Sequence, residues 1–290
     1  MLSRTYDTEF TTNFEYFMPK SDNKQKFTIL YTHGFCSDPW GRKPEEIKKW
    51  CLKNNIAMYR YELAGHGSDA ARFEQTDINI WKAQILEIID KYIEGDIVLV
   101  GSSLGGWLSM IAAINRPNRI KGLVGLAAAP DFTVDNIKCA NHWRQPVESE
   151  FQADFQSDWQ AQLGGNGDTS GVSRMVLHHM KYATPAQIEE MEKYGKITYP
   201  GQNITFTVTK RLIDSGNENL ILDKESIDIF CPVVLIQGMQ DTSVDWHKAL
   251  KIAERVKTND VIVKLLKNTG HRLNDDFAIN EILSALDTFL

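Results

Sequence analysis

The stretch Ile97-Val98-Leu99-Val100-Gly101-Ser102-Ser103-Leu104-Gly105-Gly106 is the most informative part of this chain of 290 residues. It opens with a short apolar, β-branched block, which is typical of a buried parallel strand. Residues 106–113, which begin at the last residue of this stretch and continue beyond it, have the composition of a helix. A serine between two glycines at a strand-to-helix turn forms the pattern G-x-S-x-G, whose serine hydroxyl is a nucleophile. We therefore predict that Ser103 is the nucleophile of an enzyme.

The two glycines of this pattern have a steric explanation. The turn is so sharp that side chains at positions 101 and 105 would collide with each other or with the turn. The strained backbone at Ser103 directs the hydroxyl away from the sheet, toward the N-terminus of the following helix. The backbone N–H of Leu104 is free there, and the helix dipole favours a developing negative charge. A Gly/Ser-rich loop without chemistry is the alternative, but the flanking strand and helix favour the nucleophile.

The composition of the chain excludes several classes of protein. It is 42% hydrophobic and 24% charged, an ordinary globular composition with enough apolar material for a substantial core. The net charge of −6, without a basic stripe, argues against a nucleic-acid partner. The four cysteines include no C-x-x-C pair and are too few for a disulfide scaffold, so free thiols in a reducing compartment are expected.

The N-terminal segment points to a cytoplasmic protein. It lacks the apolar core of a signal peptide, and it contains Asp7 and Glu9, which a transit peptide would avoid. No apolar run has the length of a membrane span, so we expect no stable membrane insertion.

The organisation of the chain predicts an α/β fold. Strand and helix patterns alternate, which implies right-handed crossovers and a mostly parallel central sheet with helices on both faces. In such sheets, ligands bind beyond the carboxyl ends of the strands. The expected strands are 27–32, 57–61, 97–100, 122–127, 232–238 and 260–266, the expected helices are 44–54, 78–94, 246–256 and 276–289, and an edge hairpin is expected over 5–18.

The alternation stops between residues 131 and 229, where the chain is polar, aromatic and irregular. A structureless loop of this length is improbable in a compact domain, so we interpret 131–229 as an inserted helical cap or lid on a core formed by 1–130 and 230–290. Helices are expected over 184–194 and 204–215. Four cap aromatics either line an acyl pocket or simply pack the cap: Trp143, Phe151, Phe155 and Trp159.

A nucleophilic serine needs a base, and the base needs an orienting carboxylate. In a fold with this turn, these residues follow in the order Ser, acid, His. Asp241 follows the strand 232–238, and His271 follows the last strand, so we predict that they are the acid and the base. Asp131, which follows the strand 122–127, is the rival acid.

The remaining histidines do not fit the role of base. His33 and His66 also lie in loops at strand ends, but they precede the serine in the chain, which is the wrong order. His178 and His179 are adjacent, so on a helix they point in different directions and do not form a metal-binding pair. No metal or cofactor is expected.

An oxyanion hole requires a second backbone donor besides Leu104, and in this kind of fold it comes from the loop after an earlier strand. That loop is 33–37, where Gly34 lets the backbone turn so that the N–H of Phe35 can point at the substrate oxygen. We predict Phe35 as the donor, with Cys36 as the alternative. Losing one such donor typically costs about 3–4 kcal/mol of transition-state stabilisation.

These motifs, taken together and in this order, resemble the α/β-hydrolase superfamily. The region 100–108, the segment 238–241 with Asp245-Trp246-His247, and Ile47 with Trp50-Cys51 are similar to the ABHD-type serine hydrolases of the palmitoyl-protein thioesterase and acyl-glucuronide esterase subgroup. The resemblance implies the α/β-hydrolase fold and hydrolysis of acyl esters or thioesters. The four motifs that carry the wider resemblance are His33-Gly34-Phe35, Gly65-His66-Gly67-Ser68, the segment 101–105 and Gly270-His271.

The sequence therefore predicts a serine hydrolase that cleaves carboxylic ester or thioester bonds of small acyl substrates through an acyl-enzyme intermediate. Two alternatives stay open. The same fold could serve another reaction, such as hydrolysis of a C–C or amide bond or a cofactor-free haloperoxidase reaction. It could also form a non-catalytic ligand-binding protein.

Overall fold

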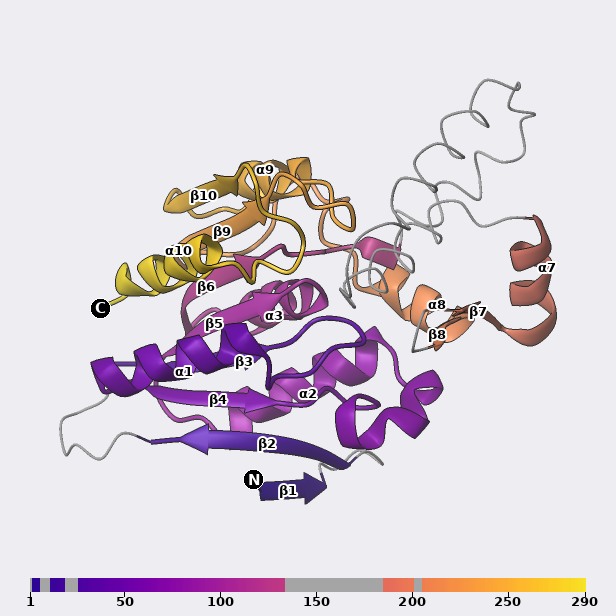
Figure 1. Ribbon diagram of the computed structural model, residues 1–290, viewed down its shortest axis with the longest axis horizontal. Helices are drawn as coiled ribbons and strands as arrows, with labels where there is room; N and C mark the ends of the chain where they lie inside the picture. Colours follow the sequence, from indigo (N-terminus) through magenta and orange to yellow (C-terminus); the bar gives the residue numbers. More distant parts are fainter. Residues whose placement is uncertain (1, 6–10, 19–25, 134–184, 201–204) are drawn as a thin grey trace.

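The computed structural model describes residues 2–5, 11–18, 26–133, 185–200 and 205–290. Its centre is an eight-stranded sheet with the strand order β1-β2-β4-β3-β5-β6-β9-β10 (Figure 1). The strands are β1 Leu2–Thr5, β2 Thr11–Phe17, β3 Thr28–Thr32, β4 Ala57–Tyr61, β5 Ile97–Ser102, β6 Ile120–Leu126, β9 Val233–Gly238 and β10 Val261–Leu266.

The sheet is mostly parallel, which confirms the predicted fold class. From β4 to β10 all neighbouring strands run in the same direction. β2 pairs antiparallel with both β1 and β4, so the hairpin expected over 5–18 is present at the edge of the sheet. The carboxyl ends of the parallel strands consequently meet along one rim, where this class of sheet binds its ligands.

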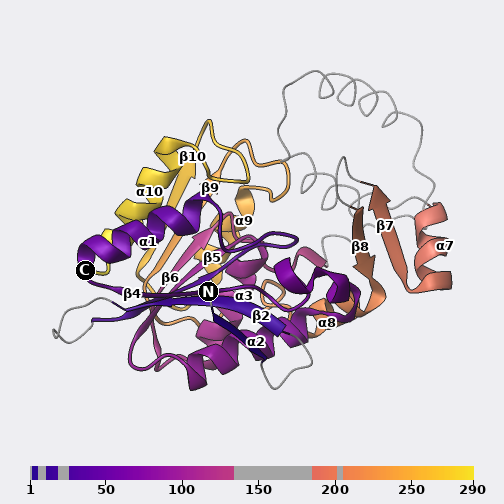
Figure 2. The ribbon, with the colours of Figure 1, turned by 60° about the horizontal axis from the view of Figure 1, so that its bottom comes forward.

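Helices cover both faces of the sheet, as Figure 2 shows. The buried residues of α2, α3 and α9 belong to the apolar cluster on one face, and those of α1 and α10 belong to the cluster on the other face. The helices are α1 Arg42–Asn54, α2 Ile78–Lys91, α3 Leu104–Asn115, α9 His247–Arg255 and α10 Asp276–Asp287, and the 3-10 segment η1 spans Gly67–Gln75.

Strand β5 shows how the sequence produces this layered core. Successive side chains of a strand point to opposite faces. Ile97 and Leu99 accordingly pack with α2 and α3, whereas Val98 and Val100 pack with α1 and α10. All four are completely buried. The near-continuous apolar run therefore reflects a strand covered on both sides.

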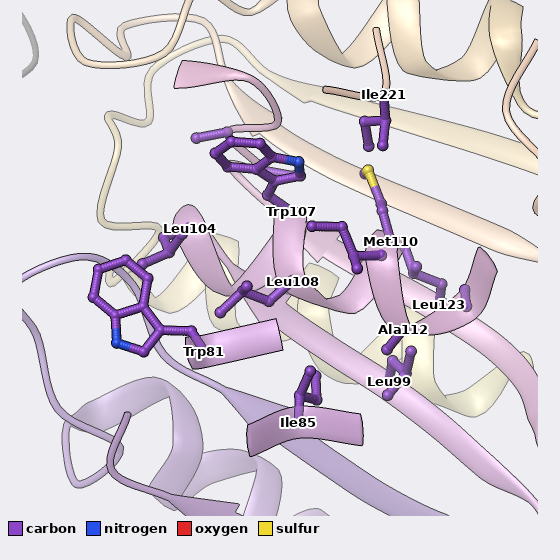
Figure 3. Packing of buried hydrophobic residues seen from close by; sticks show 14 of the residues in the cluster. Trp81, Ile85, Leu99, Leu104, Trp107, Leu108, Met110, Ala112, Leu123 and Ile221 are labelled. Carbon is purple, nitrogen blue, oxygen red and sulfur yellow. The ribbon is translucent and has the colours of Figure 1, made fainter. Parts of the chain in front are cut away.

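The helix α2 buries the face that its periodicity predicts. Trp81, Ile85, Ile88 and Ile89 are all fully buried. Figure 3 shows Trp81 and Ile85 among the apolar side chains of this cluster. Asp77 caps the helix, because its carboxylate accepts a hydrogen bond of 2.9 Å from the backbone N–H of Ile80.

The described part of the expected cap consists of α7 Pro185–Tyr194, β7 Lys196–Pro200, β8 Thr205–Thr209 and α8 Lys210–Glu218. In Figure 1 these elements lie to the right of the sheet, on the side toward which β4 runs. Two ion pairs connect them to the core, from Lys196 to Glu74 at 2.8 Å and from Arg211 to Asp77 at 2.5 Å.

The helix predicted over 204–215 is wrong in its first half. Residues 205–209 form β8, which pairs antiparallel with β7, and the helix α8 begins only at Lys210. The sequence Thr-Phe-Thr-Val-Thr alternates polar and apolar residues and is rich in β-branched side chains, which favours a strand. Thr209 ends the strand and caps α8, since its hydroxyl accepts a hydrogen bond from Leu212 N.

Candidate active site

Ser103 lies at the turn between β5 and α3, in a strained backbone conformation. Its φ of 54° is in the left-handed region, which a residue with a side chain rarely adopts. Strand β6 and the segment after it hold the turn in place. The N–H of Ser103 donates to the carbonyl of Leu126 at 2.9 Å, and the carbonyl of Ser103 accepts from the N–H of Ala129 at 3.1 Å. The strain is therefore compensated by fixed backbone hydrogen bonds.

The structure agrees with the steric explanation for the two glycines. A Cβ atom at Gly101 would lie 2.3 Å from the carbonyl oxygen of Gly105. A Cβ atom at Gly105 would lie 2.1 Å from the carbonyl oxygen of Thr32. Both distances are far below van der Waals contact with backbone atoms that cannot move aside. The turn that presents Ser103 thus requires glycine at both positions.

The structure brings Ser103, His271 and Asp241 together. The Nε2 atom of His271 lies 3.1 Å from the Oγ atom of Ser103, and its Nδ1 atom lies 2.7 Å from the Oδ2 atom of Asp241. Asp241 follows β9 and His271 follows β10, so the parallel strands deliver all three to the same rim of the sheet. The Asp241 carboxylate is completely buried, and the His271 side chain keeps 16% exposure.

Four donors surround the carboxylate of Asp241. Its Oδ1 atom accepts from the N–H groups of Ser243 and Val244, each at 2.8 Å. Its Oδ2 atom accepts from the Nε2 atom of Gln237 at 2.8 Å and faces the ring of His271. Both oxygens are therefore fixed in orientation before any substrate binds. Gln237 is not among the predicted site residues, although a polar residue at the end of the apolar strand 233–236 is a visible signal in the sequence.

Asp131, the rival acid, is used elsewhere. Its carboxylate accepts hydrogen bonds from the backbone N–H groups of Ile221, at 2.9 Å, and Leu222, at 2.6 Å. Burial raises the pKa of Asp131, while these two backbone bonds lower it. Asp131 thus holds the segment at Ile221 and Leu222 beside the end of β6. The carboxylate that faces His271 is that of Asp241.

The loop after β3 lies directly beside the serine. A Cβ atom at Gly34 would be 3.2 Å from the Cβ atom of Ser103. The N–H of Cys36 is already engaged, because it donates to the Nε2 atom of His66 at 3.1 Å. Leu104 is the first residue of α3, so its N–H has no acceptor within the helix.

Aromatic rings continue from this loop into the described part of the core. The ring of Phe35 lies 5.3 Å from that of Phe73 and 5.6 Å from that of Phe132, measured between centroids. The four cap aromatics considered in the sequence analysis lie outside the described residues: Trp143, Phe151, Phe155 and Trp159.

Three further features concern metal ions, cysteines and membrane-spanning helices in the described ranges. Among these residues, no group of three or more His, Cys, Asp or Glu side chains gathers so that it could hold a metal ion. Cys36, Cys51 and Cys231 are free thiols, and Cys139 lies outside the described residues. No helix in the described part of the chain combines the length and the apolar character needed to cross a bilayer.

Comparison with known proteins identifies the family. The sequence profile of the alpha/beta hydrolase fold matches residues 28–278. The chain belongs to the alpha/beta hydrolase family. Among solved structures, mouse alpha/beta hydrolase domain-containing protein 10 superposes with a TM-score of 0.72 and 24% sequence identity, covering 99% of this chain and 96% of that one. This likeness confirms the predicted α/β-hydrolase fold.

Two kinds of curated relative agree on the type of reaction. The mitochondrial palmitoyl-protein thioesterase ABHD10 of Rattus norvegicus is 28% identical over 262 residues, which cover 90% of this chain and 74% of the relative. The monoglyceride lipase of the same species is 20% identical over 279 residues, which cover 93% of this chain and 84% of the relative. Both relatives carry the names of enzymes that hydrolyse ester or thioester bonds, which agrees with the predicted class of enzyme.

One expectation is corrected by the same comparison. The first residues, which resemble neither a signal peptide nor a transit peptide, predict a cytoplasmic protein. The relatives from rat, cattle and human are named as mitochondrial proteins, and this contradicts the expectation. Residues 2–5 form strand β1 of the sheet, so the composition of this segment reflects the fold and is a poor basis for assigning a compartment.

Proposed function

We propose that this alpha/beta hydrolase cleaves acyl esters or thioesters through a covalent acyl-enzyme on Ser103. The observation that carries the proposal is the continuous chain of contacts from Ser103 Oγ to His271 Nε2 and from His271 Nδ1 to Asp241 Oδ2. A serine hydroxyl becomes a useful nucleophile only next to a base, and the base must hold the correct tautomer. A non-catalytic ligand-binding protein would have no need of this arrangement.

In the proposed mechanism, His271 takes the proton of Ser103 as the hydroxyl attacks the carbonyl carbon of the substrate. Asp241 keeps the proton on Nδ1 and stabilises the imidazolium that forms. The tetrahedral intermediate collapses, and His271 gives the proton to the departing alcohol or thiol. Water, activated by the same imidazole, then releases the carboxylic acid and restores Ser103.

The N–H groups of Phe35 and Leu104 are the proposed oxyanion donors. Leu104 lies at the N-terminus of α3, where the helix dipole favours negative charge. Phe35 is favoured over Cys36 because the Cys36 N–H already donates to His66. Each donor is expected to contribute about 3–4 kcal/mol to transition-state stabilisation.

The acyl group of the substrate is proposed to lie between the rim of the sheet and the cap, which we take to be residues 131–229 on a core of 1–130 and 230–290. The names of the relatives, a palmitoyl-protein thioesterase and a monoglyceride lipase, support a fatty acyl group rather than a short one. The apolar rings of Phe35, Phe73 and Phe132 suit such a chain.

Labelling with a fluorophosphonate tests the nucleophile. The wild-type chain should be labelled on Ser103, and Ser103→Ala should abolish both labelling and hydrolysis of p-nitrophenyl acyl esters. Ser102→Ala is the matched control, because it removes the neighbouring hydroxyl of the same motif and should leave labelling intact. Labelling at another serine, or hydrolysis that survives Ser103→Ala, would contradict the proposal.

A panel of substrates then defines the reaction. Oxygen esters and thioesters with matched acyl chains of increasing length should both be hydrolysed, with kcat/KM rising toward fatty acyl chains. Rates that favour amide or C–C bond substrates would instead support the alternative reactions on the same fold.

A further inference from the structure

Two loops beside the active site are joined by a reciprocal pair of histidines. The loop after β3 contributes His33, whose Nε2 atom accepts the backbone N–H of Leu63 at 2.9 Å. The loop after β4 contributes His66, whose Nε2 atom accepts the backbone N–H of Cys36 at 3.1 Å. The histidine ring of each loop thus accepts a hydrogen bond from a backbone N–H of the other loop. We call His33 and His66 the histidine clasp.

We propose that the histidine clasp positions the loop after β3 so that the N–H of Phe35, and not that of Cys36, serves the oxyanion. His33 and His66 are then positioning residues that act through the backbone of this loop. The inference rests on the proposed function, since it concerns the oxyanion site of Ser103.

The hydrogen bonds define the protonation state of both rings. A ring nitrogen that accepts a backbone N–H must carry a lone pair, so the proton of each neutral ring lies on Nδ1. The Nδ1 atom of His33 lies 2.8 Å from the carbonyl oxygen of Gly34, and that of His66 lies 3.1 Å from the carbonyl oxygen of Ala64. Both nitrogens of both rings are therefore satisfied without a charge.

The environment of the rings keeps them neutral. His33 is completely buried, and His66 is 3% exposed. Burial lowers the pKa of His33 to about 4. Burial, and then the neighbouring ring of His33, lowers the pKa of His66 to about 3. Both rings therefore stay neutral near neutral pH, which fits a positioning role and not that of a base.

The loop after β4 is firmly held by its own contacts, so it can fix the position of the loop after β3. Helix α2 supplies two side chains that bond to Ala64: the Nε1 atom of Trp81 donates to its carbonyl oxygen at 2.9 Å, and the Oε1 atom of Gln84 accepts from its N–H at 2.9 Å. The ring of His66 is packed against those of Phe73 and Trp81, at 5.2 and 5.4 Å between centroids.

The loop after β3 needs this support because its backbone is strained at Cys36. Cys36 has a φ of 51°, in the left-handed region that a residue with a side chain rarely adopts. The hydrogen bond from its N–H to His66 stabilises this conformation. Without it, the loop can relax, and a buried donor loses its partner. A relaxed loop would shift the Phe35 N–H away from the position at which the oxyanion forms.

His66→Leu and His66→Gln test the clasp in the full chain. Leucine removes the acceptor, whereas the Oε1 atom of glutamine can reach the position of the imidazole Nε2 and accept the Cys36 N–H. Trp50→Phe is the control for a lost hydrogen bond remote from the site, since Trp50 Nε1 donates to Asp287 at 2.8 Å. For each variant we would measure the folded fraction, kcat and KM per fluorophosphonate-labelled site, and Ki for a trifluoromethyl ketone that forms a tetrahedral oxyanion.

We expect His66→Leu to lower kcat by about 10- to 100-fold with little change in KM, and to raise Ki for the ketone by a similar factor. His66→Gln should recover most of the loss, and Trp50→Phe should match the wild type. An unchanged kcat per labelled site and an unchanged Ki in His66→Leu would overturn the clasp, even if the variant were less stable. If His66→Leu does not fold, His66→Gln becomes the test. A folded His66→Gln protein whose kcat is still about 10- to 100-fold below the wild type would also overturn the clasp.

Long-range ¹H–¹⁵N spectra of the wild-type chain measure the clasp without any assay of activity. Both rings should carry their proton on Nδ1, and a proton on Nε2 of His66 would refute the contact with Cys36. A wild-type chain that shows these tautomers but is not labelled at Ser103 would refute the proposed function while leaving the contact itself intact.

Discussion

At the scale of single residues, Gln237 is the least expected member of the site. Its Nε2 atom donates to the same oxygen of Asp241 that faces His271, and also to the carbonyl of Val244 at 3.3 Å. Gln237 is 1% exposed, so neither bond competes with water. It therefore helps to hold in place the carboxylate oxygen that faces His271. A role of this kind is invisible in a motif, because the motif specifies only the acid.

Replacing Gln237 by leucine should lower kcat/KM by about 10-fold, because the carboxylate of Asp241 loses one of the bonds that orient it. The free energy of unfolding should fall by about 1–3 kcal/mol, since Asp241 loses a buried donor. Steady-state kinetics and urea unfolding measure the two effects.

Gln237→Glu provides the comparison, because it keeps the shape of the side chain and places a second carboxylate against Asp241. We expect a larger loss and an altered pH–rate profile, since like charges at this distance oppose ionisation of both groups. Wild-type activity in both variants would show that Gln237 does not orient Asp241.

At the scale of elements, the strand-to-helix turn between β5 and α3 depends on how closely β3 and α3 approach. The carbonyl oxygens of Thr32 and His33 would lie 2.1 and 2.6 Å from a Cβ atom at Gly105. The end of β3 and the first turn of α3 thus touch without any side chain between them. This close contact brings the loop after β3 next to Ser103.

Gly105→Ala should therefore destabilise the protein by at least about 2–3 kcal/mol, because either α3 or β3 must move. Activity should fall even in the folded fraction, since the same displacement separates the loop after β3 from Ser103. Thermal unfolding and activity per labelled serine would show both effects.

Gly41→Ala is the matched control. Gly41 has a φ of −71°, and a Cβ atom there meets nothing within 4 Å. Because Gly41 is the N-cap of α1 and alanine caps less well than glycine, this variant should lose at most about 1 kcal/mol of stability. Equal effects of the two substitutions would contradict the steric account of the turn.

At the scale of the whole molecule, the buried histidines make stability depend on pH. The pKa values of His33 and His66 are lowered from 6.5 to about 4 and about 3 in the folded protein. The unfolded chain therefore binds more protons than the folded chain below pH 6.5. Their contribution to stability is complete above that pH and is lost as the pH falls toward the folded values.

Urea unfolding between pH 7 and pH 5 should show this loss. Once the pH is well below 6.5, each histidine should lower the free energy of unfolding by about 1.4 kcal/mol per pH unit. His66→Gln should remove the share of one histidine and leave a shallower slope. A free energy of unfolding that stays constant over this range would mean that both rings are protonated as easily in the folded state as in the unfolded chain.

The sequence alone predicted the α/β fold, a hydrolase of ester or thioester bonds and the chain order of the candidate triad residues. These features are encoded locally: the β-branched run 97–100 selects a strand, glycines 101 and 105 permit the turn, and Asp241 and His271 directly follow strands. The helix expected over 204–215 failed because a two-residue alternation at 205–209 competes with a helical interpretation, and pairing with β7 decides between them.

Only the tertiary structure decided which polar groups meet. Asp131 and Asp241 look alike in the sequence, and they differ because the chain returning at Ile221 takes the first and the ring of His271 meets the second. Likewise, the N–H of Cys36 meets the ring of His66, which lies thirty residues away in the sequence. Hydrogen bonds between distant loops are set by the packing of the sheet and its helices, and no local pattern of residues records them.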